Sequence, residues 1–187
     1  MSCTRRAFLT AASGLVIGAR VAGAAAQGAN DRIRIGVIGT GGRARGLMTA
    51  LKRLPGTDLV AVCDVYEPRL LQAAEIAGAA ATKTVDYRRI LDDRQVDAVV
   101  IGTPDHWHKT ITLDAVAAGK DVYVEKPVSH TIAEGEEMVK AIEASKQIVQ
   151  TGTQQRSWDH FVLGKQIIDS GRPVSYTHLT LPTNREV

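Results

Sequence analysis

Short apolar runs alternate with amphipathic segments along most of the chain, and a glycine, proline or polar break follows each run. The runs are rich in β-branched residues, which is typical of strands buried on both faces. The segments between them have helical spacing and short connections. The alternation predicts an α/β fold with a Rossmann-type, doubly wound parallel sheet. The expected strands are 33–38, 59–63, 82–84, 97–101, 121–124 and 147–150.

Capping signals mark several of the intervening helices. Pro68 suits a first helical turn, and Gly78 suits the end of the same helix. Thr131 and Glu134 have the spacing of a capping box. The expected helices are 47–54, 67–77, 87–91, 106–118, 131–145 and one from Ser157 to about 171.

The break after the first run has the glycine spacing G-x-G-x-x-A, at Gly39, Gly41 and Ala44. Gly39 would allow a tight turn, and Gly41 would let a pyrophosphate approach the backbone. Ala44 is small enough for the helix to pack on the strand. Free N–H groups at the helix N-terminus would then face the phosphates. Taken alone, the spacing also fits an ordinary strand-turn-helix unit.

An acidic residue, Asp64, follows the second apolar run. In dinucleotide-binding folds an acid about 20 residues beyond the glycines accepts a hydrogen bond from the ribose 2′-hydroxyl. Such a carboxylate repels a 2′-phosphate, so the sequence favours NAD, while nearby Arg69 leaves NADP open. Strand, turn, helix, strand and acid in this order predict a dinucleotide site. Its cofactor-binding residues are expected to be Gly39, Thr40, Gly41, Gly42, Arg43 and Asp64.

The length of 187 residues allows one full domain and little more. The formal net charge is +3, and Arg5, Arg6 and Arg20 lie in a leader without acidic residues. The rest of the chain therefore balances to 3 − 3 = 0, which argues against a nucleic-acid partner. Two cysteines, Cys3 and Cys63, do not make a disulfide framework, and Cys63 is expected to be a small core residue.

Residues 1–26 have the pattern of a cleavable export signal. Arg5 and Arg6 precede Phe8 and Leu9, which resembles a twin-arginine signal. The apolar part is short for a membrane span, so no stable membrane anchor is expected after cleavage. The leader predicts a periplasmic or otherwise exported protein; an alanine-rich N-terminus without fixed structure is the alternative.

Two later motifs resemble the Gfo/Idh/MocA family of oxidoreductases. They are Thr103-Pro104-Asp105-His106-Trp107-His108 and Tyr123-Val124-Glu125-Lys126-Pro127, and the resemblance covers about residues 32–172. Ala44 departs from the glycine common there in the family. The resemblance implies a nucleotide-binding domain, here 27–156, and a C-terminal substrate domain that we expect to be absent from this chain. Residues 157–173 would form a helix leading towards it.

The same resemblance implies roles for individual residues. Lys126 would be catalytic, lying near the nicotinamide and a reacting hydroxyl, where a cation favours a developing oxyanion. Glu125 would contact the nicotinamide ribose or orient Lys126, whereas a solvated pair at a strand end is the alternative. The family turn also leads us to expect a cis Lys126–Pro127 peptide. Thr103, Pro104 and His108 would line the nicotinamide side.

Other polar residues fit less specific interpretations. His106 and His108 are two residues apart, so on a helix they do not share a face and no metal site is expected. Arg156, in the Gly152–Arg156 segment after the last strand, could reach substrate or phosphate, or be a plain surface arginine. Residues 174–187 alternate like a strand but also resemble a translated adapter sequence, and we expect them to be a non-native tail.

The function that the resemblance implies is NAD(P)-dependent hydride transfer between a sugar-like or cyclitol-like hydroxyl and nicotinamide. Because the substrate domain is expected to be missing, this chain should bind a dinucleotide without turning over substrate. A homo-oligomeric full-length form is compatible with the resemblance. Two alternatives remain open: a non-catalytic dinucleotide-binding module, and an NAD-dependent, redox-neutral glycosidase.

Overall fold

The computed structural model describes residues 32–171, so the predictions for the leader and for the 174–187 tail fall outside the described residues. Within 32–171, no helix is both long and apolar enough to cross a membrane. The strands are β1 (Ile33–Ile38), β2 (Thr57–Cys63), β3 (Thr82–Thr84), β4 (Ala98–Ile101), β5 (Asp121–Val124) and β6 (Val149–Thr151). The helices are α2 (Gly42–Leu51), α3 (Glu67–Ala77), α4 (Arg88–Asp92), α5 (His108–Ala117), α6 (Ile132–Glu143) and α7 (Asp159–Asp169), with 3₁₀ turns η3 (Asp105–Trp107) and η4 (Gln154–Ser157).

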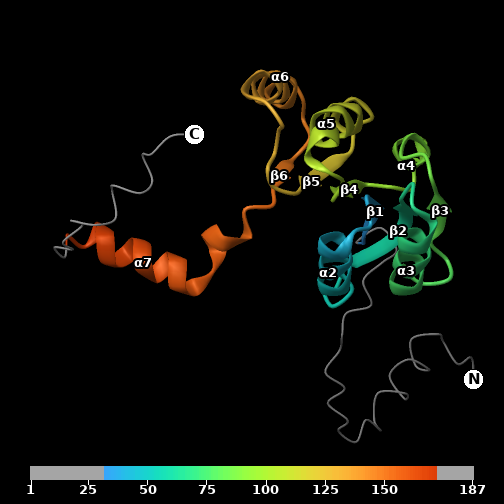
Figure 1. The fold of residues 1–187 in the computed structure, drawn as a ribbon, viewed down its shortest axis with the longest axis horizontal. Coiled ribbons are helices and arrows are strands. Elements are labelled where there is room, and N and C mark those ends of the chain that lie inside the picture. Colours follow the sequence, from blue (N-terminus) through green and yellow to red (C-terminus); the bar gives the residue numbers. More distant parts are fainter. Residues whose placement is uncertain (1–31, 172–187) are drawn as a thin grey trace, which may run out of the picture. The chain divides into compact units, whose positions relative to one another are not determined.

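The six strands form one sheet in the order β3-β2-β1-β4-β5-β6, and every neighbouring pair is parallel. The predicted doubly wound parallel sheet is confirmed. The chain runs outward from β1 to β3 and then crosses back to β4, so β1 and β4 are neighbours at the point where the order reverses (Figure 1). In such sheets ligands bind beyond the carboxyl ends of the strands at this point.

Alternate residues of the central strands β1, β2 and β4 enter two separate hydrophobic cores. Val37, Val62 and Val100 face the core that α2 and α3 cover. On the opposite face lies a core that includes residues of α4 and α5, where Ile38, Cys63 and Ile101 are buried. Figure 1 shows α2 and α3 on one side of the sheet and α5 and α6 on the other. The burial of Cys63 confirms its predicted place in the core.

Most element boundaries shift by one to three residues from the sequence prediction, and three segments differ more. The helix after the glycine turn begins at Gly42, because the Arg45 N–H already donates to the Gly41 carbonyl at 3.0 Å. Residues 105–107 form a 3₁₀ turn ahead of α5. Ser157 does not cap α7, because it ends η4 and the extended residue Trp158 is the N-cap.

The capping box at the start of α6 is present as predicted. The Glu134 N–H donates to the Thr131 hydroxyl at 3.2 Å, and the Thr131 N–H donates to the Glu134 carboxylate at 3.1 Å. The box fixes where the chain turns from the loop after β5 into the helix.

Candidate functional site: a cavity at the carboxyl edge of the sheet

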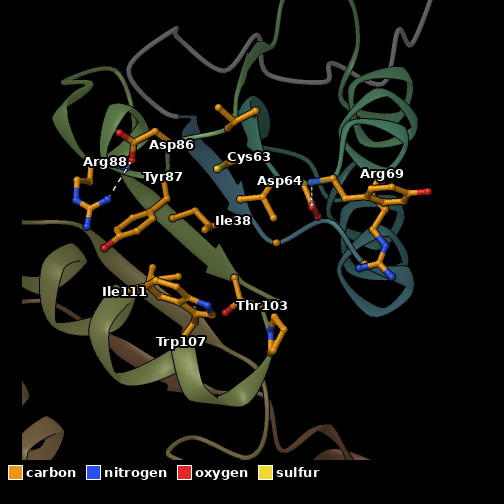
Figure 2. A pocket seen from close by; sticks show the side chains of 17 residues that line it. Ile38, Cys63, Asp64, Arg69, Asp86, Tyr87, Arg88, Thr103, Trp107 and Ile111 are labelled. Atoms are coloured by element: carbon orange, nitrogen blue, oxygen red, sulfur yellow. Dashed lines mark hydrogen bonds and ion pairs between the residues drawn. The ribbon is translucent and has the colours of Figure 1, made fainter.

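A cavity of about 500 Å³ opens where β1, β2 and β4 end. Figure 2 shows Asp64, Tyr87 and Trp107 entering it from three different loops. Its walls combine backbone of the glycine turn, apolar side chains and a few charged groups, which is the usual composition of a small-molecule site. Among the lining residues are Gly39, Gly41, Asp64, Val65, Tyr66, Arg69, Val85, Tyr87, Arg88, Thr103, Pro104, Trp107 and Ile111.

The glycine turn has the form that its spacing predicts. Gly39 has a φ of +79°, and a Cβ there would lie 2.6 Å from the Thr103 backbone nitrogen. At Gly41 and Gly42, by contrast, an added Cβ would meet nothing within 4 Å. Gly41 is the N-cap of α2, so no side chain covers the first-turn N–H groups. This backbone is therefore open to a phosphate-bearing ligand, as the residues of a dinucleotide site require.

Helix α2 lies close to β4 because the residues between them are small. Ala44 is fully buried, and a Cβ on Gly102 would come within 2.9 Å of the Ala44 Cβ. This contact confirms the packing predicted for Ala44. It also fixes the N-terminus of α2 against the end of β4, beside the cavity.

Asp64 lines the cavity, and its two carboxylate oxygens already accept three hydrogen bonds from the protein. The Thr40 N–H donates to Asp64 Oδ2 at 2.7 Å, and the Thr40 hydroxyl donates to the same oxygen at 3.0 Å. The Tyr66 N–H donates to Oδ1 at 2.9 Å. Asp64 therefore ties the glycine turn to the end of β2. The predicted cofactor residue Thr40 is fully buried, and its side chain holds Asp64.

Arg43 and Glu125 form an ion pair next to the glycine turn. Arg43 Nε donates to Glu125 Oε1 at 2.6 Å, which raises the pKa of the guanidinium above its ordinary value. The sequence placed both residues in the cofactor site; the structure shows them bound to each other. Burial, followed by the nearby Glu125 carboxylate, raises the pKa of the neighbouring Tyr123.

Lys126 lies two residues beyond the end of β5 and is exposed. Its backbone N–H donates to Glu125 Oε2 at 3.3 Å, so Glu125 contacts the Lys126 backbone. Among residues 32–171, no hydrogen bond or ion pair of the Lys126 ammonium is found. The Lys126–Pro127 peptide is cis, as predicted. Lys126 thus presents an unengaged cation at the edge where ligands of this fold bind.

The predicted nicotinamide-side residues take different positions. Thr103 and Pro104 line the cavity, and the Thr103 hydroxyl oxygen is buried with no hydrogen-bond partner in the described part of the chain. His108 is 1% exposed. Its Nδ1 lies 2.6 Å from the Pro127 carbonyl and its Nε2 lies 3.0 Å from the Thr103 carbonyl. His108 therefore does not line the cavity and instead joins the loops after β4 and β5.

Sequence reasoning gave no role to several cavity residues. Trp107 stood in the quoted motif, which was the available signal in the sequence, and the structure leaves it 44% exposed in the cavity wall. Arg88 lies 4.7 Å from the centre of the Tyr87 ring. Arg69, which the sequence already connected with NADP, lies 5.7 Å from the centre of the Tyr66 ring. These side chains come from the segments that follow β2, β3 and β4, which are the start of α3, the start of α4 and η3, and which are separate in the sequence.

Other reactive groups near the edge are engaged. Burial raises the pKa of the Cys63 thiol to about 12, so the thiol stays protonated at neutral pH. Asp105 accepts from His130 across 3.4 Å, which lowers the pKa of that carboxyl. Within residues 32–171, no group of three or more histidine, cysteine or acidic side chains is placed to hold a metal.

Comparison with known proteins gives a consistent set of similarities. The Gfo/Idh/MocA family model, described as an oxidoreductase family with an NAD-binding Rossmann fold, matches residues 33–153. Inositol 2-dehydrogenase of Rubrobacter xylanophilus is 36% identical over 149 residues, which is 78% of this chain and 42% of that protein. A glycosyl hydrolase family 109 protein of Solibacter usitatus is 33% identical over 127 residues, 63% of this chain and 29% of that protein.

Solved structures match the same region. Myo-inositol 2-dehydrogenase from Lactobacillus plantarum superposes with a TM-score of 0.69 at 31% identity, covering 75% of this chain and 42% of that one. Myo-inositol dehydrogenase from Lactobacillus casei, solved with NAD(H) and myo-inositol, superposes with a TM-score of 0.70 at 26% identity. The match covers 75% of this chain and 42% of that one. The chain thus spans about two fifths of the inositol dehydrogenases that it matches.

Proposed function

The chain belongs to the Gfo/Idh/MocA family of oxidoreductases, and we propose that it forms the cofactor-binding half of an NAD(P)-dependent enzyme acting on a sugar-like or cyclitol-like hydroxyl. The observation that carries this proposal is the open backbone of Gly41 in a cavity that Asp64 also lines. The inositol 2-dehydrogenase relatives support the substrate class.

The residues of the cavity fit a dinucleotide. The N-terminus of α2 at Gly41 would hold the pyrophosphate, because its N–H groups are uncovered and its dipole favours an anion. A carboxylate offers about four acceptor positions, and Thr40 and Tyr66 occupy three at Asp64. The position that remains suits one ribose hydroxyl. Apolar Val65, Val85 and Trp107 would enclose the base.

Lys126 would act on the substrate hydroxyl. When bound, the nicotinamide supplies the hydride acceptor. Oxidation of an alcohol also requires that the hydroxyl proton pass to a base or to water. The Lys126 ammonium, which is already protonated, would not take that proton but would favour the negative charge that develops on the oxygen. The ammonium of Lys126 is available for this, since Glu125 bonds to the Lys126 backbone and to Arg43.

A second candidate, a redox-neutral glycosidase with bound NAD, is favoured by the similarity to the glycosyl hydrolase family 109 protein. The experiment that separates the two assays the full product of the gene with NAD⁺ and a panel of cyclitols, sugars and aryl glycosides. A dehydrogenase accumulates NADH in proportion to oxidised polyol. Aryl glycoside cleavage without net NADH would contradict the proposed function and favour the glycosidase.

We expect the chain to bind NAD⁺ at least about tenfold more tightly than NADP⁺, because the Asp64 carboxylate disfavours a 2′-phosphate. Titration with both cofactors, followed by calorimetry, measures the ratio. Replacing Arg69 by alanine tests the competing possibility, since Arg69 lines the same cavity. Tighter NADP⁺ binding by the native chain, lost in Arg69→Ala, would refute the NAD assignment.

The leader supports a further proposal, that the protein is exported in folded form by a twin-arginine route to the periplasm. Arg5 and Arg6 precede an apolar segment and a small-residue cleavage pattern ending at about Ala26. Fusing residues 1–31 to a fluorescent reporter tests this. Replacing Arg5 and Arg6 by lysine should retain the reporter in the cytoplasm, and unchanged export would contradict the proposal.

A further inference from the structure

The Glu125 carboxylate is buried next to the exposed lysine at the carboxyl edge of the sheet. Its side chain is 6% exposed, although Lys126, the next residue, is open to solvent. Oε2 accepts from the Lys126 backbone N–H at 3.3 Å, and Oε1 lies 3.5 Å from the Tyr123 hydroxyl. A Cβ on Gly152 would lie 3.0 Å from the Glu125 Cδ, so the backbone after β6 closes over the carboxylate. A carboxylate buried in this way needs a compensating cation.

Arg43 supplies that cation. Its Nε donates to Glu125 Oε1 at 2.6 Å, and no other basic side chain among residues 32–171 forms an ion pair with this carboxylate. Arg43 is the second residue of α2, and Glu125 directly follows β5. Because β4 lies between β1 and β5 in the sheet, the pair reaches across the end of β4. It therefore joins the glycine turn to the segment that carries Lys126.

The position of Arg43 in its helix indicates that the arginine serves this pairing. The positive end of the helix dipole disfavours a cation, and the first turn of α2 contains no acidic residue. Arg45, two residues further on, instead donates to the Thr40 carbonyl at 2.8 Å. A cation at position 43 is thus unfavourable unless an anion lies beside it, and Glu125 is the anion that the structure places there.

Lys126 is the cation that would take the place of Arg43. It is adjacent to Glu125 in the sequence, and its backbone already bonds to the carboxylate. If position 43 were neutral, the buried carboxylate would attract the Lys126 ammonium, because charges that water screens poorly interact strongly. An ammonium drawn onto Glu125 would no longer be available to a substrate oxygen.

We propose that Arg43 is a positioning residue for Lys126: its guanidinium neutralises the buried Glu125 carboxylate and so leaves the Lys126 ammonium free to act on a substrate hydroxyl. The inference rests on the proposed function for the role of Lys126. It changes the role of Arg43 from the predicted cofactor contact to an action through Glu125. A purely structural ion pair would leave the reactivity of the Lys126 amine unchanged, which distinguishes the two roles.

Trace acetylation of the 187-residue chain with acetic anhydride tests the proposal without cofactor or turnover. Only the neutral amine reacts, and an ammonium paired with a carboxylate holds its proton more tightly. In Arg43→Gln, Lys126 should therefore react about tenfold more slowly than in the native chain. Mass spectrometry measures this rate relative to that of Lys146, which is also exposed. Unchanged reactivity of Lys126 would overturn the proposal.

Three further variants control this measurement. Arg43→Lys keeps a cation beside Glu125, and the double variant Arg43→Gln with Glu125→Gln removes the charge that would attract the ammonium. Both should show the native reactivity of Lys126. Arg53→Gln, which changes an exposed arginine just beyond α2, should also leave it unchanged. Slow reaction of Lys126 in any of the three would overturn the proposal, and the first two keep the test decisive if Arg43→Gln does not fold.

Kinetics of the full product of the gene provide a second readout. Arg43→Gln should lower kcat at least about tenfold, while the Kd for NAD⁺ should change less than about twofold. A variant that binds NAD⁺ more weakly but keeps its kcat would return Arg43 to the cofactor site and overturn the proposal. Failure of the native enzyme to reduce NAD⁺ would instead contradict the proposed function, and acetylation would still decide whether Arg43 keeps Glu125 from Lys126.

Discussion

Replacing Lys126 by methionine in the full product of the gene is expected to lower kcat by roughly 10²–10³-fold, the usual cost of removing a group that stabilises a developing oxyanion. Methionine keeps most of the side-chain length but removes the ammonium. NAD⁺ affinity should change little, because the glycine turn and Asp64 provide the cofactor contacts proposed here. Steady-state kinetics with the best polyol substrate and calorimetric NAD⁺ titration measure the two effects.

Lys146→Met is the control for the lysine substitution. Lys146 is also exposed, but it precedes β6 and therefore lies at the amino edge of the parallel sheet, away from the cavity. This variant should retain full turnover. A Lys126→Met enzyme with near-native kcat would show that another group stabilises the developing oxyanion, whereas a parallel loss in both variants would indicate a general effect on folding.

Replacing Gly41 by valine is expected to weaken NAD⁺ binding at least about 100-fold, equivalent to about 2.7 kcal/mol. In the structure a Cβ at Gly41 meets nothing within 4 Å, and the φ of −60° is open to any residue. The fold should therefore tolerate the change, and the new side chain would fill the space through which a pyrophosphate approaches. Calorimetry with NAD⁺ and thermal unfolding measure both consequences.

Gly46→Val is the matched control, because Gly46 lies in the same helix with no atom within 4 Å of an added Cβ. Gly46 is exposed and does not line the cavity. The Gly46→Val chain should therefore bind NAD⁺ with unchanged affinity. Equal loss of affinity in both variants would indicate damage to α2, and retained affinity in Gly41→Val would remove the glycine turn from the binding site.

The fold could be predicted because local patterns and tertiary structure agree in this chain. The β-branched runs form the buried central strands, as predicted. The capping box predicted from the spacing of Thr131 and Glu134 is present at the start of α6. The turn at Gly39 and the helix end at Gly78 could also be predicted, because both residues have a positive φ, which is costly for residues other than glycine. The prediction that Ser157 caps the last helix was wrong, because Ser157 belongs to the 3₁₀ turn η4 that precedes α7.

The candidate site was predicted in position more accurately than in detail. Strand ends identified Asp64 and Thr103, because parallel strands bring their carboxyl ends to one edge. The Arg43–Glu125 pair and the burial of His108 could not be read from the sequence. Both features depend on contacts between residues that are far apart in the sequence. Neither a hydrophobic periodicity nor a short motif predicts such contacts.

The central claim is that the cavity around Gly41 and Asp64 binds NAD, and calorimetric titration of the 187-residue chain with NAD⁺ tests it most directly. The account predicts saturable binding of one NAD⁺ per chain, competition by AMP, and loss of binding in Gly41→Val but not in Gly46→Val. A folded chain, verified by circular dichroism and cooperative unfolding, that shows no saturable binding at millimolar NAD⁺ would contradict it.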